Sequence, residues 1–163
     1  MLISTALRWR CVAFDALSPS DLYRVLQRRA EVFVVEQHCV FQDMDGRDAE
    51  ALHLLGEATE PPAGAALLAY ARLLPPATAF AEASIGRVVT APSTRGSGLG
   101  HALMRESIAE LHRQWGHQAI RIGAQSHLQA FYGQHGFEPS GDLYLEDGIE
   151  HIEMVRQCFN PRP

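Results

Sequence analysis

The sequence predicts a single mixed α/β domain, in which helices alternate with strands along the chain. Segments with apolar residues at helical spacing are separated by short apolar runs typical of strands, in the order β-α-β-β-β-α-β-α-β-β. The chain has 163 residues, of which 47% are hydrophobic. This is enough for one well-buried core and too little for two ordinary domains, so we expect residues 1–163 to form one domain.

A strand and a capped helix open the chain. We expect a strand over residues 9–17 and a helix over residues 19–33, where apolar residues recur at helical spacing. Ser18 is suited to cap the helix, with a proline at the first helical position, and Asp21 completes a capping box. The stretch 34–50 that follows is acidic and is predicted to be irregular.

A hairpin and a further strand lead to the most distinctive part of the sequence. Residues 52–57 and 65–74 are predicted to pair as strands across a loop that contains Pro61-Pro62. Residues 85–90 are predicted as a fourth strand, which runs directly into a glycine-rich turn. The later elements are predicted as a helix, a strand, a short helix and two strands over residues 99–115, 119–124, 127–135, 142–146 and 149–156. Each of these two helices ends just before a glycine.

The glycine-rich turn, residues 95–100, reads Arg-Gly-Ser-Gly-Leu-Gly and is the most informative motif. Its glycines leave the backbone amides free of side-chain cover, and the first turn of a helix has N–H groups without a partner inside the helix. The helix dipole and Arg95 both add positive charge at this point. The turn is therefore predicted to bind a phosphate group.

Two common nucleotide-binding loops do not fit this turn. A Walker loop ends in Gly-Lys-Ser/Thr, and no lysine follows here. The dinucleotide fingerprint requires a third glycine at the position of His101, and an acidic residue about 20 positions farther on, where Ile120 and Arg121 stand. Neither a nucleoside triphosphate nor a dinucleotide is therefore expected as the ligand.

The spacing of Arg95, Gly98 and Gly100 instead fits the pattern Arg/Gln-x-x-Gly-x-Gly/Ala. In this respect the turn resembles the acyl-CoA pyrophosphate loop of the GCN5-related N-acetyltransferase (GNAT) superfamily. Tyr132 and the pair Gly136-Phe137 resemble the second signature of that family. Further segments resemble its ElaA-like branch, namely residues 29–45, 70–72, 85–89, 123–125 and 146–151. The resemblance covers about residues 9–157, which is nearly the whole chain.

The resemblance implies the acyl-CoA N-acyltransferase fold, with a central, mostly antiparallel sheet flanked by helices. It also implies that the fourth strand offers backbone groups to the pantetheine arm and the thioester carbonyl of acetyl-CoA, while the turn binds the pyrophosphate. The implied cofactor-binding residues are Val88, Val89, Thr90, Arg95, Gly96, Ser97, Gly98, Leu99, Gly100 and His101. The valine side chains also suit the core of a strand, and both roles are compatible.

Tyr132 is the candidate catalytic residue, as a general acid. A phenol placed close to the sulfur would return a proton to the leaving thiolate. The alternative is that Tyr132 is only a packed aromatic residue of its helix, but Phe131 beside it is expected to supply the core-facing ring. The general base is left open among five candidates, none of which is assigned as catalytic: Glu36, His53, Glu146, Asp147 and His151.

The composition of the chain indicates which binding partners and which cellular location to expect. The formal net charge of −5 argues against broad nucleic-acid binding and mildly favours an amine or cationic partner. Neither a signal peptide nor a membrane span is recognisable, so we expect a cytoplasmic protein without a membrane partner. Three widely spaced cysteines favour reduced thiols, with Cys39 as a buried structural thiol. The eight histidines show no metal-ligand spacing, so no metal is predicted.

The acidic stretch 43–48, Asp-Met-Asp-Gly-Arg-Asp, is similar to a calcium loop. Its glycine comes too early, however, and the glutamate that ends such a loop is missing. An acidic turn is therefore favoured. Together with Glu36 and Glu50, this stretch could form an acidic rim that attracts a protonated amine.

These features predict an N-acetyltransferase that transfers the acetyl group of acetyl-CoA to a primary amine by direct attack in a ternary complex. The acceptor is expected to be a small molecule or a peptide. The alternatives are a non-catalytic acyl-CoA-binding sensor, against which Tyr132 argues, and a redox enzyme, against which the dinucleotide spacing argues. The acceptor, the general base, the range of acyl groups and the oligomeric state, a homodimer included, are left open.

Overall fold

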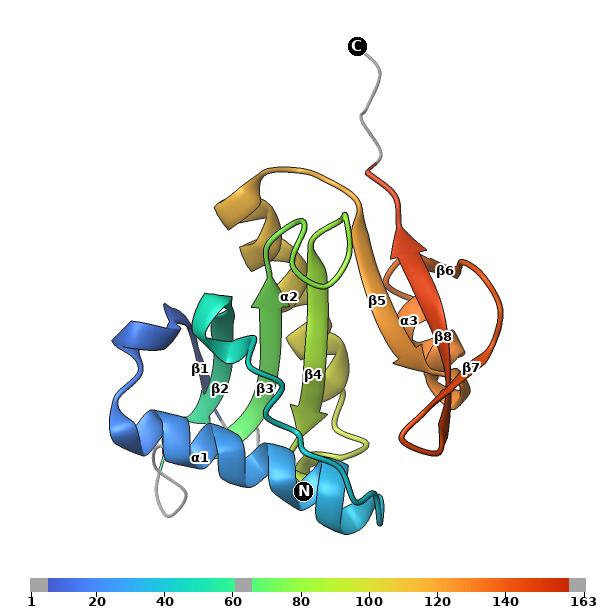
Figure 1. Cartoon of the computed structure of the whole chain (residues 1–163). Coiled ribbons are helices and arrows are strands. Elements are labelled where there is room, and N and C mark those ends of the chain that lie inside the picture. The colour runs from blue at the N-terminus through green and yellow to red at the C-terminus, as the bar shows by residue number, and fades with distance from the viewer. Residues whose placement is uncertain (1–5, 61–65, 159–163) are drawn as a thin grey trace.

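The computed structural model describes residues 6–60 and 66–158, and Figure 1 shows their arrangement. Strands of this part of the chain form two antiparallel sheets. The first sheet has the order β1 (Leu7–Ala13), β2 (Leu52–Ala58), β3 (Leu67–Leu74) and β4 (Ser84–Thr90). The second has the order β5 (Ile120–Gln125), β8 (Ile149–Arg156) and β6 (Phe137–Pro139), and β7 (Tyr144–Glu146) also pairs with β8. The predicted mixed fold with a mostly antiparallel sheet is confirmed.

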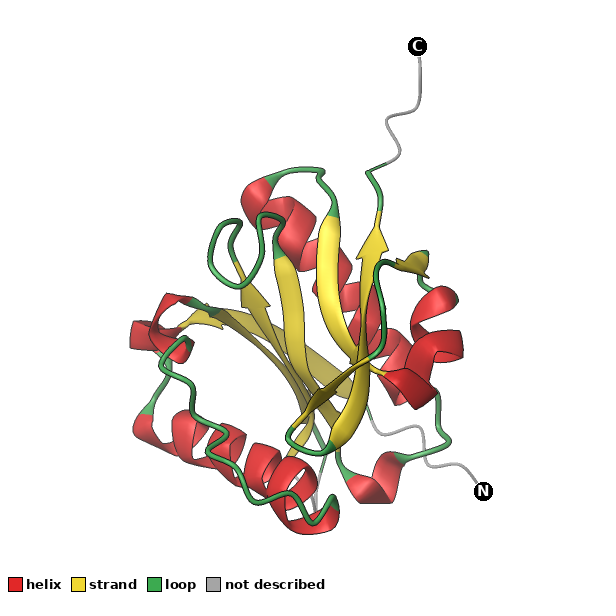
Figure 2. Ribbon diagram, turned by 45° about the vertical axis from the view of Figure 1, so that its right-hand side comes forward, coloured by secondary structure: helices red, strands yellow, loops and turns green. Residues whose placement is uncertain are grey.

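Two helices cover opposite faces of the first sheet. α1 (Pro19–Arg29) crosses one face and α2 (Leu99–Trp115) lies on the other, as Figures 1 and 2 show. β3 lies between the two apolar clusters that result. Ala71 and Leu73 join the cluster around α2, whereas Tyr70 joins the cluster around α1. Both faces of the sheet are therefore buried at its centre, which makes β3 a rigid base for neighbouring β4.

The predicted capping box at the start of α1 is confirmed. Ser18 Oγ accepts a hydrogen bond from the Asp21 amide at 3.0 Å, and Asp21 Oδ2 accepts one from the Ser18 amide at 3.3 Å. Beyond α1 the chain continues as a wider, π-helical segment, Ala30–Glu36. The expectation that residue 34 begins an irregular stretch was therefore wrong. No glycine or proline stands in this segment to end the helix, and the chain widens its turn instead.

Other boundaries differ from the prediction by a few residues. β1 ends at Ala13 rather than at residue 17, because the next residues form a tight helical turn, Phe14–Ala16, that leads the chain into the cap of α1. The short strand β6 was not predicted, since three residues carry too little periodicity to be recognised. The predicted Pro61-Pro62 loop lies outside the described residues.

Among the described residues, one isolated bridge joins the two sheets, between the residue before β4 and the start of β5. Ala83 and Ile120 form an isolated parallel bridge, and beyond it the strands diverge (Figure 1). A bulge in β4 contributes to this divergence, because Arg87 and Val88 together lie opposite the single residue Ala71 of β3. Arg87 has a φ angle of +51° at the bulge. Since bulges bend the strand that carries them, the end of β4 is directed away from β5.

Candidate functional site

A cleft of about 830 Å³ opens where β4 and β5 diverge. It is lined by those strands, the glycine-rich turn, α3 (Gln129–Gly133), the segment after α1 and the turn between β7 and β8. Two contacts reach the second sheet from the segment after α1. The Cys39 thiol donates to the Asp147 carbonyl, and the Gln125 side-chain amide donates to Gln37 Oε1, each at 3.2 Å. Cys39 is buried, as predicted, and helps to close this side of the cleft.

The glycine-rich turn has the conformation that suits an anion site. Gly96 and Gly98 have φ angles of +79° and +84°, which residues with a side chain rarely adopt. Gly98 is the N-cap of α2, and no side chain caps the helix there. The first amides of α2 therefore keep their hydrogen-bonding capacity for a ligand, at the positive end of the helix dipole.

Arg95 lies beside this turn with its guanidinium in an ion pair. Its Nη1 and Nη2 lie 2.7 and 3.0 Å from the two carboxylate oxygens of Glu36, at the end of the π-helical segment. Both side chains are exposed, so the pair contributes little to stability. An anion bound at the turn would therefore compete with Glu36 for Arg95.

The predicted cofactor-binding residues divide into two groups. Those that line the cleft are Val88, Val89, Thr90, Arg95 and Gly100. Those that do not line it are Gly96, Ser97, Gly98, Leu99 and His101. Leu99 is buried in the apolar cluster around α2, so its backbone alone is available to a ligand. Ser97, Gly98 and His101 line a second, shallower hollow at the start of α2, where Nδ1 of His101 is 2.9 Å from Nε2 of His135.

The end of β4 offers its side chains to the core and its backbone edge to the cleft. Val89 is buried in the cluster around α1, and Val88 packs against the cluster around α2. β4 is the last strand of its sheet, so beyond the bridge at Ala83 one edge of its backbone has no strand partner within residues 6–60 and 66–158. The packing role and the backbone-binding role predicted for these residues are therefore compatible.

Tyr132 lines the cleft from α3 and is more deeply buried than predicted. Its side chain packs edge-on against Phe131 and Phe137, with ring centroids 5.0 and 6.2 Å apart, and the residue is 8% exposed. The expectation that Phe131 alone supplies the core-facing ring was wrong, because Tyr132 is itself part of the core. Its hydroxyl has no hydrogen-bond partner among the described residues. Burial raises the pKa of Tyr132 to about 12, so the phenol stays protonated at neutral pH.

The structure separates the five candidate bases. His53 does not line the cleft, because it is buried between Tyr70 Oη, 2.8 Å from its Nδ1, and the Asp48 carbonyl, 2.9 Å from its Nε2. Burial also lowers the pKa of His53. Glu36 lines the cleft but is paired with Arg95.

The other three candidates, Glu146, Asp147 and His151, line the cleft from the hairpin of β7 and β8. His151 Nδ1 lies 2.7 Å from the Ile149 carbonyl, and this carbonyl can only accept a hydrogen bond. Nδ1 therefore carries the proton of the neutral ring, which leaves the lone pair on Nε2. That atom is 3.6 Å from Glu146 Oε2.

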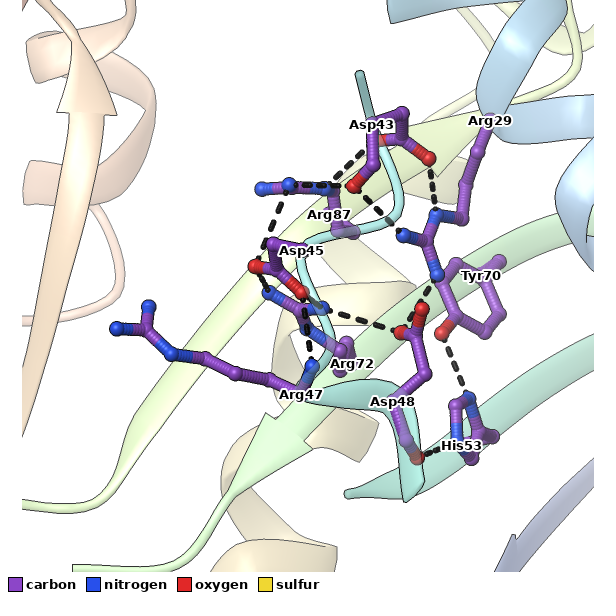
Figure 3. A network of polar contacts seen from close by, with 9 residues as sticks. All are labelled: Arg29, Asp43, Asp45, Arg47, Asp48, His53, Tyr70, Arg72 and Arg87. Carbon is purple, nitrogen blue, oxygen red and sulfur yellow. Dashed lines mark hydrogen bonds and ion pairs between the residues drawn. The ribbon is translucent and has the colours of Figure 1, made fainter. Parts of the chain in front are cut away.

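The acidic stretch 43–48 is neutralised by arginines, as Figure 3 shows. The ion pairs are Arg29–Asp43, Arg29–Asp48, Arg72–Asp45, Arg72–Asp48 and Arg87–Asp43, at 2.7 to 3.1 Å. We call these six residues the Arg–Asp network. Arg29 is 0% exposed, so its charge lies wholly inside the protein. The predicted acidic rim is therefore wrong, because the three aspartates already have guanidinium partners.

The network also fixes the protonation of its aspartates. Burial alone would raise the pKa of Asp48, but hydrogen bonds from Arg29 and Arg72 outweigh it and hold the pKa below its ordinary value. The same balance, with Arg72 as the main partner, lowers the pKa of Asp45. These arginines were not predicted, although Arg29 carries a local signal. It stands on the apolar face of α1, where a buried charge requires a partner.

Residues 6–60 and 66–158 contain neither a metal-binding cluster nor a membrane-spanning helix. No three side chains of His, Cys, Asp or Glu lie close enough together there to hold a metal ion. Nor does this part of the chain contain a helix whose length and apolar character would let it cross a bilayer.

Comparison with known proteins finds relatives over nearly the whole chain. Residues 21–158 match the acetyltransferase (GNAT) domain family. ElaA of Escherichia coli (strain K12) is 39% identical over 155 residues, which are 94% of this chain and 98% of ElaA. The crystal structure of Escherichia coli ElaA aligns with a TM-score of 0.83 at 38% identity, over 93% of this chain and 100% of that one.

Two further crystal structures share the fold. An acyl-CoA N-acyltransferase from Pseudomonas aeruginosa aligns with a TM-score of 0.84 at 42% identity, over 93% of this chain and 99% of that one. An aminoglycoside 6′-N-acetyltransferase complexed with coenzyme A aligns with a TM-score of 0.66 at 15% identity, over 94% and 99% of the two chains, and its likeness extends to the fold alone. The chain therefore belongs to the GNAT acetyltransferase family, in which it is a homologue of ElaA.

Proposed function

We propose that the protein transfers an acetyl group from acetyl-CoA to a primary amine, which attacks the thioester directly in a ternary complex. The observation that carries the proposal is the cleft between β4 and β5, which has Arg95 and Gly100 of the glycine-rich turn at one end and the phenol of Tyr132 on its wall. Family membership supports acyl transfer. The coenzyme A complex of the aminoglycoside acetyltransferase supports coenzyme A as the carrier.

In this proposal the coenzyme lies along β4. The amides at the start of α2 and the Arg95 guanidinium bind the pyrophosphate. The pantetheine arm follows the free edge of β4 from Thr90 to Val88, which is about 7 Å of strand. A backbone amide near Val88 donates to the thioester carbonyl, whose oxygen gains negative charge as the amine attacks. Such a donor is worth about 3 kcal/mol in other acyl-transfer sites.

The proton balance limits the role of Tyr132. The acceptor nitrogen loses one proton as the C–N bond forms, and the sulfur gains one as the C–S bond breaks. The pKa of Tyr132 is about 12, whereas that of an ordinary thiol is about 8.5. A phenol whose pKa lies above that of the thiol shares its proton with the developing thiolate more readily than it gives the proton up. Tyr132 accordingly stabilises the developing thiolate through a hydrogen bond, and the proton given up by the acceptor balances the one that sulfur gains.

His151 is the best-supported general base. It lines the cleft, and the hydrogen bond from its Nδ1 to the Ile149 carbonyl leaves the Nε2 lone pair available for a proton. The Glu146 carboxylate, 3.6 Å from Nε2, would stabilise the imidazolium that results. The acceptor nitrogen would thus lose its proton on the side of the cleft formed by β7 and β8.

Thiol release from acetyl-CoA tests the proposal, with a panel of polyamines, amino sugars, amino acids and peptides as acceptors. Coenzyme A binding is measured separately by calorimetry. Turnover with an amine supports the enzyme. Tight binding of coenzyme A without turnover would favour the acyl-CoA sensor, and a lack of binding would overturn the assignment of the cleft. A cytoplasmic location, the lack of nucleic-acid and membrane partners, a single domain and a homodimer stay predictions.

A further inference from the structure

Among the described residues, the arginine side chains along the cleft have carboxylate partners, with one exception. Arg72, Arg87 and Arg95 line the cleft, and each is paired. Arg47 lines it too, and within residues 6–60 and 66–158 its guanidinium has neither a hydrogen bond nor an ion pair. Figure 3 shows this side chain extended away from the Arg–Asp network, with no contact at its end. A solvated guanidinium at a cleft wall is suited to bind a ligand anion.

The backbone of Arg47 is held in place by the network. Its amide donates to Asp45 Oδ1 at 3.1 Å, and the preceding Gly46 turns the chain with a φ angle of +81°. Asp45 in turn accepts two hydrogen bonds of 2.7 Å from Arg72, which is only 3% exposed. The residue is therefore presented from a fixed turn, which lowers the entropy lost when it binds a ligand.

Arg47 lies far from the turn assigned to the pyrophosphate. Arg72, which holds its turn, is paired with Gly86 across β3 and β4. The glycine-rich turn follows the opposite end of β4, beyond Thr90. Gly86 and Thr90 are separated by about 13 Å of strand. Arg47 is therefore available to a second anion, on the other side of the reacting carbonyl near Val88.

The hairpin of β7 and β8 has the opposite charge. Its residues Glu146, Asp147 and His151 line the cleft, whereas Arg156, at the end of β8, does not. An amine is attracted to these groups, whereas Arg47 repels an ammonium and attracts an anion. The acceptor part of the cleft thus combines one unpaired cation with an acidic hairpin.

We propose that the acceptor is a primary amine that also carries a carboxylate or phosphate group, which Arg47 binds while the amine faces His151. This inference rests on the proposed acetyl transfer and names its substrate class. Amino acids and amino phosphates fit the cleft, because a guanidinium forms two parallel hydrogen bonds with either anion. Polyamines do not fit, since they would bring a second cation to Arg47.

Matched acceptor pairs test this class. Glycine, β-alanine and γ-aminobutyrate are each compared with their carboxamides, and phosphoethanolamine with ethanolamine, so that the charge and its distance from the nitrogen vary separately. We expect the best anionic acceptor to have a kcat/KM roughly 10- to 100-fold above that of its neutral partner. Preference for phosphoethanolamine over the amino acids would identify phosphate as the anion.

Variants of Arg47 link this preference to the residue. Arg47→Gln should abolish the preference by raising the KM of the anionic acceptor, with the KM of acetyl-CoA unchanged, and Arg47→Lys should retain part of it. Arg113→Gln is the matched control, because Arg113 lies on α2 and does not line the cleft. Equal reaction of both members of every pair, or an equal loss for both in Arg47→Gln, would refute the acceptor class and leave acetyl transfer standing.

Failure of the proposed function has a different signature. If no amine is acetylated, calorimetry with the coenzyme A-loaded protein decides the inference by itself. Binding of an anionic acceptor that disappears in Arg47→Gln supports the assigned class even without turnover. Absence of such binding overturns it.

Discussion

Replacement of Tyr132 by phenylalanine removes one hydroxyl and leaves the packing of the ring in place. The lost hydrogen bond to a developing thiolate is charge-assisted, and such bonds are worth about 1.5–3 kcal/mol. This corresponds to a fall in kcat of roughly 10- to 150-fold. Because the hydroxyl has no partner among the described residues, the free energy of unfolding should change by less than about 0.5 kcal/mol. Tyr132→Phe is therefore expected to lower kcat while leaving the free energy of unfolding almost unchanged.

The assay combines steady-state thiol release at saturating acetyl-CoA with urea unfolding. Tyr70→Phe is the matched control, because Tyr70 is also buried and its hydroxyl lies 2.8 Å from His53 Nδ1. It should lose about 1–3 kcal/mol of stability, since a buried ring nitrogen is left unpaired. Tyr70 does not line the cleft, so its kcat should change little. A Tyr132→Phe variant with kcat within twofold of the wild type, or with a large loss of stability, would refute the assigned role.

Three further perturbations test the turn, the network and the acid response. Gly98→Ala places a side chain at φ +84°, which costs about 1–2 kcal/mol. It should weaken coenzyme A binding, measured by calorimetry, about tenfold. Gly133→Ala is the control, because the space around Gly133 is open, and it should leave the binding unchanged. Arg29→Met leaves two aspartates without their buried partner and should lower the free energy of unfolding by about 3–5 kcal/mol; an unchanged urea midpoint would contradict this. Burial alone would raise the pKa of Glu57, but hydrogen bonds from three arginines outweigh this effect and lower the pKa to about 2. Because the pKa of Glu57 is lower in the folded than in the unfolded protein, ionised Glu57 stabilises the fold at any pH above its unfolded-state pKa. This stabilisation is lost on acidification, so the free energy of unfolding should fall between about pH 5 and about pH 2. Glu57→Gln should flatten that profile.

The elements that local signals define were predictable from the sequence. α2 begins and ends where the prediction placed it, because its apolar periodicity is bounded by Gly98 and Gly116, both with φ angles above +79°. The cap of α1 is equally local, since Ser18 and Asp21 stand three residues apart and each accepts a hydrogen bond from the backbone amide of the other. The glycine-rich turn was also predictable from neighbouring residues alone, because its glycines adopt the positive φ angles that glycine favours.

The Arg–Asp network was beyond such reasoning. Its members stand 14 to 44 residues apart, and their pairing depends on how β3, β4 and the segment after α1 come together. The acidic stretch alone looked like an open rim, because its sequence does not show which arginines reach it. The depth of Tyr132 has a similar cause, since α3 has five residues and too little periodicity to reveal its buried side.

The isolated bridge between Ala83 and Ile120 determines where the open edges of β4 and β5 lie. An open strand edge normally invites pairing with another molecule and so promotes aggregation. In the part of the chain that the structure describes, β4 and β5 each leave such an edge open, but the two edges border one cleft instead of the outer surface of the protein. Extending the bridge into a full ladder would add hydrogen bonds and stability while eliminating the cleft. Under the proposed function, the backbone groups that β4 leaves unpaired at this edge are those that bind the coenzyme.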